Sequence, residues 1–251
     1  MKSPYEGIKR GCQYLHGFGK NDISFFLGLA GLRDGMVVLD AMCGEGALSQ
    51  QLSKKNIELH LLDNSGFQIG RAKENVKGAE FHIGSVLEMP FSDGTFDAVF
   101  IRNGVYEVSK RSQIKLYKEV LRVLKKGGLF LSWTLGLDEA QRDFVQAFVG
   151  KKDKLAGFDD LVRNRHLMTR SELSSDLKAA GFSNVGFPQN SIEYVLSTQK
   201  WGKTDFLGDK KKVSSLNEYV LGLKKPASLS LEEHGGDVRL VVSALLSVSQ
   251  K

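Results

Sequence analysis

Short apolar segments alternate with segments of helical periodicity from residue 36 to residue 135. Apolar runs of strand length lie at 36–40, 57–63, 79–84, 96–102 and 129–135. Apolar residues recur at helical spacing in the intervening stretches 46–54, 67–75 and 114–124, and Gly127 and Gly128 follow the last of these. This order predicts parallel strands joined by right-handed helical crossovers, with helices on both faces of the sheet.

The pattern changes after residue 137. Helices are predicted at 138–150 and at 170–180, and Gly181 ends the second one. Two long apolar segments, 184–198 and 237–248, are typical of a terminal hairpin that carries a large insertion at 197–236. The predicted fold is therefore α/β, a doubly wound, mostly parallel seven-stranded sheet with helices on both faces and a C-terminal antiparallel hairpin.

Composition indicates where the protein is located and which partners it could bind. The chain has 251 residues and two cysteines, Cys12 and Cys43, without paired spacing. This argues against a disulfide framework or a zinc site and favours a reducing, cytoplasmic location. The sequence contains no signal-peptide core and no run of about 18 apolar residues, so no membrane span is expected. The net charge of +6 indicates good solubility or affinity for anionic partners, and the sequence leaves the oligomeric state unknown.

A glycine-containing turn follows the first predicted strand, in VVLDAMCGEGALS. Gly44 and Gly46 would let the backbone approach a ligand where the parallel strands end. The turn half-matches the dinucleotide pattern G-x-G-x-x-G, and Asp63 at the next strand end would accept hydrogen bonds from a ribose diol. Asp40, directly before the turn, would repel a pyrophosphate and suits a ligand with a cationic group. S-adenosylmethionine combines a ribose, an adenine and an amino acid, and a nicotinamide dinucleotide is the competing ligand.

Four motifs resemble those of class I S-adenosylmethionine-dependent methyltransferases, specifically the methyltransferase type 11 group, over about residues 35–135. VVLDAMCGEG is similar to the first motif of the family, L-D-x-G-C-G-x-G, and LLDNSGFQIGRAK to its second-strand acid and following helix. LEMPFSDGTFDAVF is similar to P-F-x-D-x-x-F-D-x-V, and EVLRVLKKGGLF to E-x-x-R-V-L-K-P-G-G. The resemblance implies S-adenosyl-L-methionine as cofactor and a methyltransferase domain over 35–251, preceded by an N-terminal lid segment, 1–34. Substrate-covering insertions are expected near 137–170 and 197–236.

The resemblance also implies the residues of the cofactor site. Asp40 would anchor the turn near the methionine amino group. Asp63 would hold the ribose hydroxyls, or would act only as a helix N-cap. Further contacts would come from Ala41, Met42, Gly44, Gly46, Asn64, Ser85, Val86 and Arg102.

Two of these positions depart from the family pattern. Met42 replaces the first glycine of the motif, so it would displace the turn, pack against the cofactor, or fill the gap between helix and sheet. Ser85 replaces the usual acid for the adenine amino group, which it would bind more weakly.

The substrate side of the site is less defined. Tyr14, His16, Asn103 and Tyr106 are candidates for the substrate pocket, while His60 and His82 are expected to be structural strand residues. The general base is unknown, and some acceptors need none. The histidines and acids form no cluster in the sequence, so no metal is expected to assist the reaction.

The favoured function is in-line methyl transfer to a small-molecule acceptor. The first alternative is an RNA (tRNA) base methyltransferase, because aromatic residues alternate with lysines in the 197–236 insertion. Nucleic acid is not the favoured partner, because acids accompany those lysines. A nicotinamide-dependent oxidoreductase is the further alternative.

Overall fold

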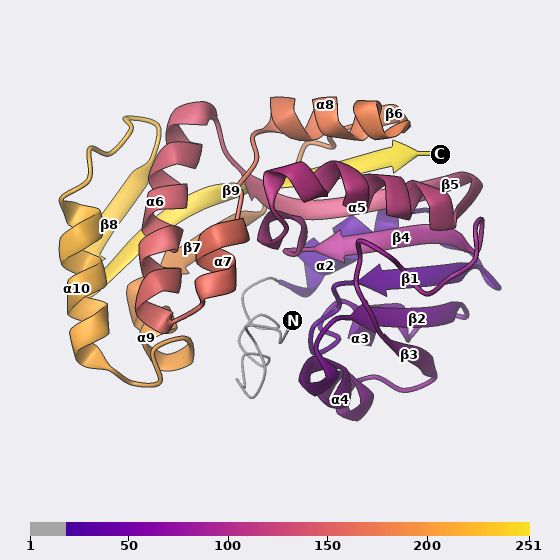
Figure 1. Ribbon diagram of the computed structural model, residues 1–251, viewed down its shortest axis with the longest axis horizontal. Coiled ribbons are helices and arrows are strands. Elements are labelled where there is room, and N and C mark those ends of the chain that lie inside the picture. Colours follow the sequence, from indigo (N-terminus) through magenta and orange to yellow (C-terminus); the bar gives the residue numbers. More distant parts are fainter. Residues whose placement is uncertain (1–18) are drawn as a thin grey trace.

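The computed structural model describes residues 19–251 (Figure 1), so the predicted pocket residues Tyr14 and His16 lie outside the described part. Its sheet follows the order β3-β2-β1-β4-β5-β9-β6. The first five strands on this path are parallel, and the last two run antiparallel to their neighbours. The strands span β1 (Val37–Ala41), β2 (Glu58–Asp63), β3 (Ala79–Ile83), β4 (Phe96–Arg102), β5 (Leu124–Gly136), β6 (Ser183–Gly186) and β9 (Asp237–Gln250). The predicted fold class and its seven-stranded path are confirmed.

The terminal hairpin is more elaborate than predicted. β7 (Glu193–Ser197) and β8 (Ser230–His234) also pair with β9, which gives nine strands in the described sheet. The predicted strand 184–198 is divided into β6 and β7, and Pro188, which has no N–H for a ladder bond, lies in the gap. β8 lies inside the expected 197–236 insertion and was missed, because three of its five residues are Glu or His.

Helices cover both faces of the parallel strands. One face packs against α2 (Lys20–Gly28), α3 (Ser49–Leu52) and α4 (Gly66–Asn75), and the other against α5 (Lys110–Val123) and α8 (Arg170–Ala180). α3 is shorter than the predicted helix 46–54. β5 already begins at Leu124, so Gly127 and Gly128 lie within its span and do not end the preceding helix. A hydrophobic core lies on each face of the sheet, and neighbours such as Val38 and Leu39 point into different cores. This is why these strands appear in the sequence as continuous apolar runs.

Part of the predicted N-terminal lid belongs to the core. Phe26 of α2 is fully buried, and its ring packs edge-on against Phe100 at 5.5 Å and Trp133 at 5.3 Å. The helix therefore contributes to the sheet packing. A covering role for residues 1–18 stays a prediction, because these residues lie outside the described part.

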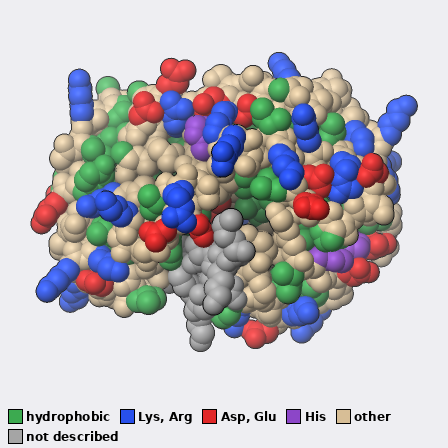
Figure 2. All heavy atoms as spheres, in the orientation of Figure 1, with side chains coloured by type: hydrophobic (Ala, Val, Ile, Leu, Met, Phe, Trp, Pro, Cys, Tyr) green, Lys and Arg blue, Asp and Glu red, His purple; other side chains and the backbone are tan. Residues whose placement is uncertain are grey.

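Most of the helices after β5 form a second group beside the parallel sheet, around the beginning of β9 (Figure 1). They comprise α6 (Glu139–Ala156), α7 (Asp159–Asn164), α9 (Thr198–Thr204) and α10 (Lys210–Leu221). Lys210 and Lys211 are exposed at the start of α10, which packs against α6 and α9. On the face in Figure 2, basic side chains are scattered among acidic ones and form no continuous stripe. Among the described residues, no helix has the length and apolar character needed to cross a membrane.

Candidate cofactor and substrate site

The turn after β1 lies at the edge where the parallel strands end. Met42, Gly44 and Gly46 all have positive φ, at 56°, 54° and 79°. A Cβ on Gly44 would meet no atom within 4 Å, whereas a Cβ on Gly46 would lie 2.7 Å from Cγ2 of Val76. The backbone of Gly44 is therefore open to an approaching ligand. Gly46 makes room for the protein's own packing, and a contact of its backbone with a ligand stays a prediction.

Asp40 holds the turn from inside the protein. Its side chain is buried, and Oδ2 accepts a 2.5 Å hydrogen bond from the Ser49 hydroxyl at the start of α3. Burial raises the pKa of Asp40 from 3.8 to about 6, against the opposing effects of the Ser49 hydrogen bond and the positive charge of Arg102. Asp40 thus ties strand to helix, and its carboxylate would be stabilised by a cation placed beside it.

Asp63 connects the end of β2 to the glycine turn. Oδ2 accepts a 2.9 Å hydrogen bond from the Gly44 N–H, and Oδ1 accepts one of 2.9 Å from the Ser65 N–H. The N-cap of α4 is Ser65, whose hydroxyl accepts from the Gln68 N–H, so Asp63 is not the cap. Burial raises the pKa of Asp63 despite these backbone hydrogen bonds. Each carboxylate oxygen keeps a second lone pair that suits a ribose hydroxyl.

Met42 packs against the loop that follows β4. A Cβ built on Gly104 would lie 2.6 Å from Sδ and 2.9 Å from Cβ of Met42. Met42 is half-buried and adopts a left-handed backbone conformation that costs a non-glycine residue about 1–2 kcal/mol. Met42 therefore connects the loop after β1 with the loop after β4. This role differs from the expected filling of a gap between helix and sheet.

The expected adenine contacts lie beyond β2 and β3. Asn64 and Ser85 are exposed and Val86 is buried. The Ser85 hydroxyl accepts a 3.1 Å hydrogen bond from the Leu87 N–H, so it shapes its own loop and retains a second lone pair. Ala41 is fully buried at the end of β1, so only its backbone is suited to contact a ligand.

β4 ends at Arg102, a predicted cofactor contact, and Asn103 of the predicted substrate pocket follows it. Arg102 places its guanidinium 5.8 Å from the centre of the Trp133 ring. Asn103 has a φ of 59°, and its N–H donates to the Trp133 carbonyl oxygen over 2.9 Å. Its side-chain Oδ1 accepts a hydrogen bond from the hydroxyl of Tyr194 in β7. This contact joins the parallel sheet to the terminal hairpin.

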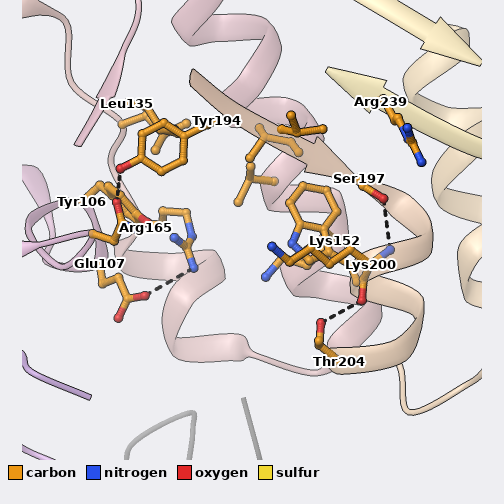
Figure 3. A pocket seen from close by; sticks show the side chains of 16 residues that line it. Tyr106, Glu107, Leu135, Lys152, Arg165, Tyr194, Ser197, Lys200, Thr204 and Arg239 are labelled. Carbon is orange, nitrogen blue, oxygen red and sulfur yellow. Dashed lines mark hydrogen bonds and ion pairs between the residues drawn. The ribbon is translucent and has the colours of Figure 1, made fainter. Parts of the chain in front are cut away.

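Asn103 and Tyr106 line one pocket of about 260 Å³ (Figure 3). Tyr106 belongs to the short helix η1 (Val105–Glu107) after β4. The remaining wall comes from β5, α6, the 165–167 segment, β7, α9 and β9, mostly in the segments expected to cover the substrate. Its apolar and aromatic lining includes Leu135, Val149, Leu167, Tyr194, Leu196 and Trp201.

A chain of alternating charges lies along this pocket. Arg165 places Nη2 3.9 Å from Oε1 of Glu107 and Nε 2.7 Å from Oδ2 of Asp153. Lys152 Nζ lies 2.5 Å from Oδ1 of Asp153 and 2.9 Å from Oδ2 of Asp205. Lys152, Asp153 and Asp205 are buried. Since buried charges need partners, this row of ion pairs fixes the relative positions of η1, α6 and α9 around the pocket.

Sequence reasoning missed Tyr194, Lys152 and Arg165. The two basic residues lie in the expected covering segment, but residues of their type usually form a solvated face, so their pairing gave no signal. His166 is not among the lining residues although both of its chain neighbours are. Its Nε2 lies 3.6 Å from Oε2 of Glu172, and burial lowers its pKa.

The residues at the strand ends fit the expected cofactor. The Gly44 backbone is open, and the two acids, Asp40 and Asp63, have their pKa values raised by burial. A ligand with a cationic group would stabilise the charged form of Asp40, and its ribose diol would donate hydrogen bonds to Asp63.

The comparisons with known proteins agree with this arrangement. The family described as "Methyltransferase domain" matches residues 38–128. A sterol 24-C-methyltransferase from Gibberella zeae is 36% identical over 107 residues, which cover 40% of this chain and 28% of that enzyme. An uncharacterized methyltransferase from Synechocystis is 35% identical over 96 residues, which cover 38% of this chain and 45% of that protein. The chain thus matches less than half the length of these curated relatives.

Solved structures show the same fold. The YcgJ protein from Bacillus subtilis superposes with a TM-score of 0.73 at 20% identity, over 93% of this chain and 99% of that one. Phosphoethanolamine N-methyltransferase 2 from Haemonchus contortus, solved with S-adenosyl-L-methionine, gives a TM-score of 0.59 at 18% identity, over 93% of this chain and 53% of that one. The family match favours methyl transfer over nicotinamide chemistry. Residues 38–128 therefore match the methyltransferase domain family, within the fold of class I S-adenosylmethionine-dependent methyltransferases.

Proposed function

We propose that this protein transfers a methyl group from S-adenosylmethionine to a small molecule held in the pocket between Asn103, Tyr106 and Tyr194. The observation that carries the proposal is the position of this pocket. Its first wall, Asn103 to Glu107, directly follows β4 of the methyltransferase domain, at the edge where the cofactor turn lies. Ligands of open parallel sheets bind at this edge.

The cofactor would be held by the strand ends and their loops. Asp63 would accept the ribose hydroxyls, and the Gly44 backbone would face the ligand. Asp40 would act from beneath the turn through its charge, because its buried side chain already accepts from Ser49. The adenine would lie between Asn64, Ser85 and Val86, and the backbone of Arg102 would border the methionine part.

The bound cofactor supplies an electrophilic methyl carbon. The protein's part is to hold the acceptor atom in line with it, since positioning alone accounts for much of the rate of such a displacement. The Tyr194–Asn103 hydrogen bond and the ion pairs around Arg165 fix the pocket wall before substrate arrives. A wall that is already ordered reduces the entropy lost on binding.

The acceptor would be a small molecule with an apolar body and a polar or charged group. Aromatic and aliphatic side chains form much of the lining, and Glu107, Arg165 and Lys200 add charge. Most lining residues lie beyond residue 128, where the family match ends. The substrates named for the relatives therefore do not define the acceptor of this chain.

The arrangement of lysines supports a small molecule over RNA. No residue of α10 lines the pocket, so the Lys210–Lys212 run is separate from it. Lys200 of α9 is the lysine of the 197–236 insertion that does line the pocket, and burial lowers its pKa.

A labelled-methyl assay tests the proposal. The protein is incubated with methyl-tritiated S-adenosylmethionine and either a small-molecule filtrate of cells or total cellular RNA. Label should enter the filtrate and resist ribonuclease. Tyr106→Ala should reduce this transfer while calorimetry with S-adenosylhomocysteine shows unchanged cofactor affinity.

The triple change Lys210→Glu, Lys211→Glu and Lys212→Glu serves as the control for nucleic acid. It should leave transfer into the filtrate unaltered. Label that enters RNA, with binding that weakens steeply with salt and is lost in the triple variant, would favour the RNA methyltransferase.

A further inference from the structure

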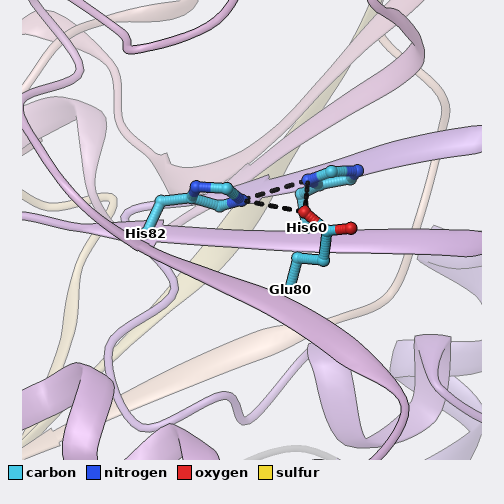
Figure 4. A group of neighbouring side chains, drawn as sticks. All are labelled: His60, Glu80 and His82. Carbon is cyan, nitrogen blue, oxygen red and sulfur yellow. Dashed lines mark hydrogen bonds and ion pairs between the residues drawn. The ribbon is translucent and has the colours of Figure 1, made fainter.

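Two histidines and a glutamate converge on one face of the sheet, on β2 and β3 (Figure 4). Nδ1 of His60 lies 3.1 Å from Nε2 of His82 and 3.5 Å from Oε2 of Glu80. Oε2 of Glu80 lies 3.8 Å from Nε2 of His82. Parallel pairing places His60 beside Glu80 and Leu62 beside His82, which puts all three side chains on the same face.

The triangle has the size of one face of a metal coordination tetrahedron. Bonds of about 2.0–2.1 Å to a tetrahedral zinc ion separate its ligand atoms by roughly 3.3–3.4 Å. Of the three observed distances between ligand atoms, one is shorter and two are longer than this value. Shifts of a few tenths of an ångström would therefore complete the geometry. Imidazole nitrogens with a carboxylate oxygen suit Zn²⁺ and related divalent transition metals.

A fourth residue orients the most buried ligand. Nε2 of His60 lies 2.9 Å from Oε1 of Glu58, and the His60 side chain is 9% exposed. If Nε2–H donates to Glu58, the neutral ring directs the lone pair of Nδ1 toward His82 and Glu80. A carboxylate behind a histidine is the usual outer partner of a metal ligand.

Aromatic rings hold the histidines in place. The ring of Phe91 packs edge-on against His60 at 6.0 Å and against His82 at 4.8 Å, and Phe96 packs against His60 at 5.4 Å. The His82 side chain is 27% exposed and that of Glu80 63%. The cluster therefore has a rigid inner side and an outer side that a metal ion can reach from solvent.

We propose that His60, Glu80 and His82 bind a divalent transition metal ion, with Zn²⁺ as the best match, and that Glu58 positions His60. The fourth coordination position faces solvent and takes a water molecule. The site lies within the sheet, apart from the turn that would hold the cofactor. Because β3 is the edge strand of the described sheet, the metal ion would fasten that strand to β2.

Zinc titration tests the proposal. The full chain is stripped with a chelator, and its binding of Zn²⁺ is followed by calorimetry and by the thermal unfolding midpoint. One equivalent should bind in the micromolar range and raise the midpoint. Glu80→Gln and His82→Gln should each weaken binding at least tenfold, and Glu58→Gln by roughly 10–100-fold.

The control is His234→Ala, which removes an exposed histidine of β8 and should bind zinc like the unaltered chain. Glu80 is exposed, so its variant should keep the metal-free midpoint even if a histidine variant folds poorly. Absence of zinc binding in the unaltered chain would overturn the proposal. So would undiminished binding in the Glu80 and His82 variants, or loss of binding in Cys12→Ser with the cluster intact.

Discussion

The Asp63 carboxylate accepts a hydrogen bond from the backbone N–H of Gly44, so the acid that ends β2 holds the turn that follows β1. The same side chain accepts from the Ser65 N–H at the start of α4. Asp63 therefore shapes the turn, and in the proposed cofactor site it would also offer oxygens to a ribose. A substitution there should then affect both stability and cofactor affinity.

Asp63→Asn should separate these tasks. Asn keeps one acceptor oxygen but loses the charge, so S-adenosylhomocysteine affinity should fall by about 2–3 kcal/mol while the unfolding free energy falls by about 1 kcal/mol. Asp63→Ala should lose a further 1 kcal/mol or so of stability, since two N–H groups lose their partner. Calorimetry and denaturant unfolding measure the two effects.

Asp97→Ala is the matched control. Asp97 accepts hydrogen bonds from the Val37 N–H at 2.8 Å and from Lys125 at 2.7 Å, at the opposite end of β1. Its loss should reduce stability and leave cofactor affinity unchanged. Equal affinity losses in the Asp97 and Asp63 variants would mean that Asp63 acts only through the fold.

The buried carboxyl of Asp40 should make stability depend on pH. Burial raises its pKa from 3.8 to about 6, so between these values the folded protein binds a proton that the unfolded chain releases. Stability from this group should therefore fall as pH rises from 4 to 6, and the full penalty, about 3 kcal/mol at most, applies above pH 6.

Asp40→Asn should remove this penalty. The variant and the unaltered protein should have similar unfolding free energies near pH 4, and the variant should be more stable by about 1–3 kcal/mol at pH 7.5. Cofactor affinity should fall at the same time, because the buried negative charge is lost. Parallel pH profiles for the two proteins would show that Asp40 does not titrate in this range.

Gly104 and Met42 should be coupled energetically. Gly104→Ala would place a Cβ 2.6 Å from Sδ of Met42, so overpacking should cost about 1–3 kcal/mol. Combining it with Met42→Gly, which opens the space, should cost at least about 1 kcal/mol less than the sum of the single changes. Denaturant unfolding of the four proteins measures the coupling.

Gly70→Ala is the control for Gly104→Ala, at a glycine where an added Cβ has space. Gly70 lies within α4, and a Cβ there would meet no atom within 4 Å. The substitution should stabilise the protein by about 0.5–1 kcal/mol, the usual difference between glycine and alanine in a helix. Additive effects at Met42 and Gly104 would contradict the contact between the two loops.

The sequence predicts contacts that follow from strand ends better than contacts that depend on register or docking. Asp63 and Gly44 meet because parallel strands end at one edge, and both could be named in advance. The His60–His82 pair depends on which residues of β2 and β3 lie side by side, which the helical crossover between them determines. Periodicity gives the strands but not that register.

The pocket was harder to predict from the sequence. Tyr194 and Asn103 are 91 residues apart, and their contact depends on how the terminal hairpin packs beside β5. The chain itself suggested Asn103, by its place after β4, but gave no corresponding signal for Tyr194. Lys152 and Arg165 appear in the sequence as ordinary charged residues of a helical segment, and only tertiary packing buries and pairs them.

Loss of Lys152 should destabilise the fold strongly. It is 2% exposed, and its ammonium group contacts both Asp153 and Asp205. Lys152→Met keeps most of the volume but leaves two buried carboxylates without their shared cation, so the unfolding free energy should fall by about 3–5 kcal/mol. Lys154→Met, an exposed change on the same helix, should stay within about 0.5 kcal/mol of the unaltered protein. Adding Asp205→Leu to Lys152→Met should recover part of the loss, because it removes a buried carboxylate that has lost its Lys152 partner. Denaturant unfolding at pH 7.5 checks all three, and a Lys152 variant as stable as the Lys154 variant would show that the buried charge chain does not fix this part of the pocket.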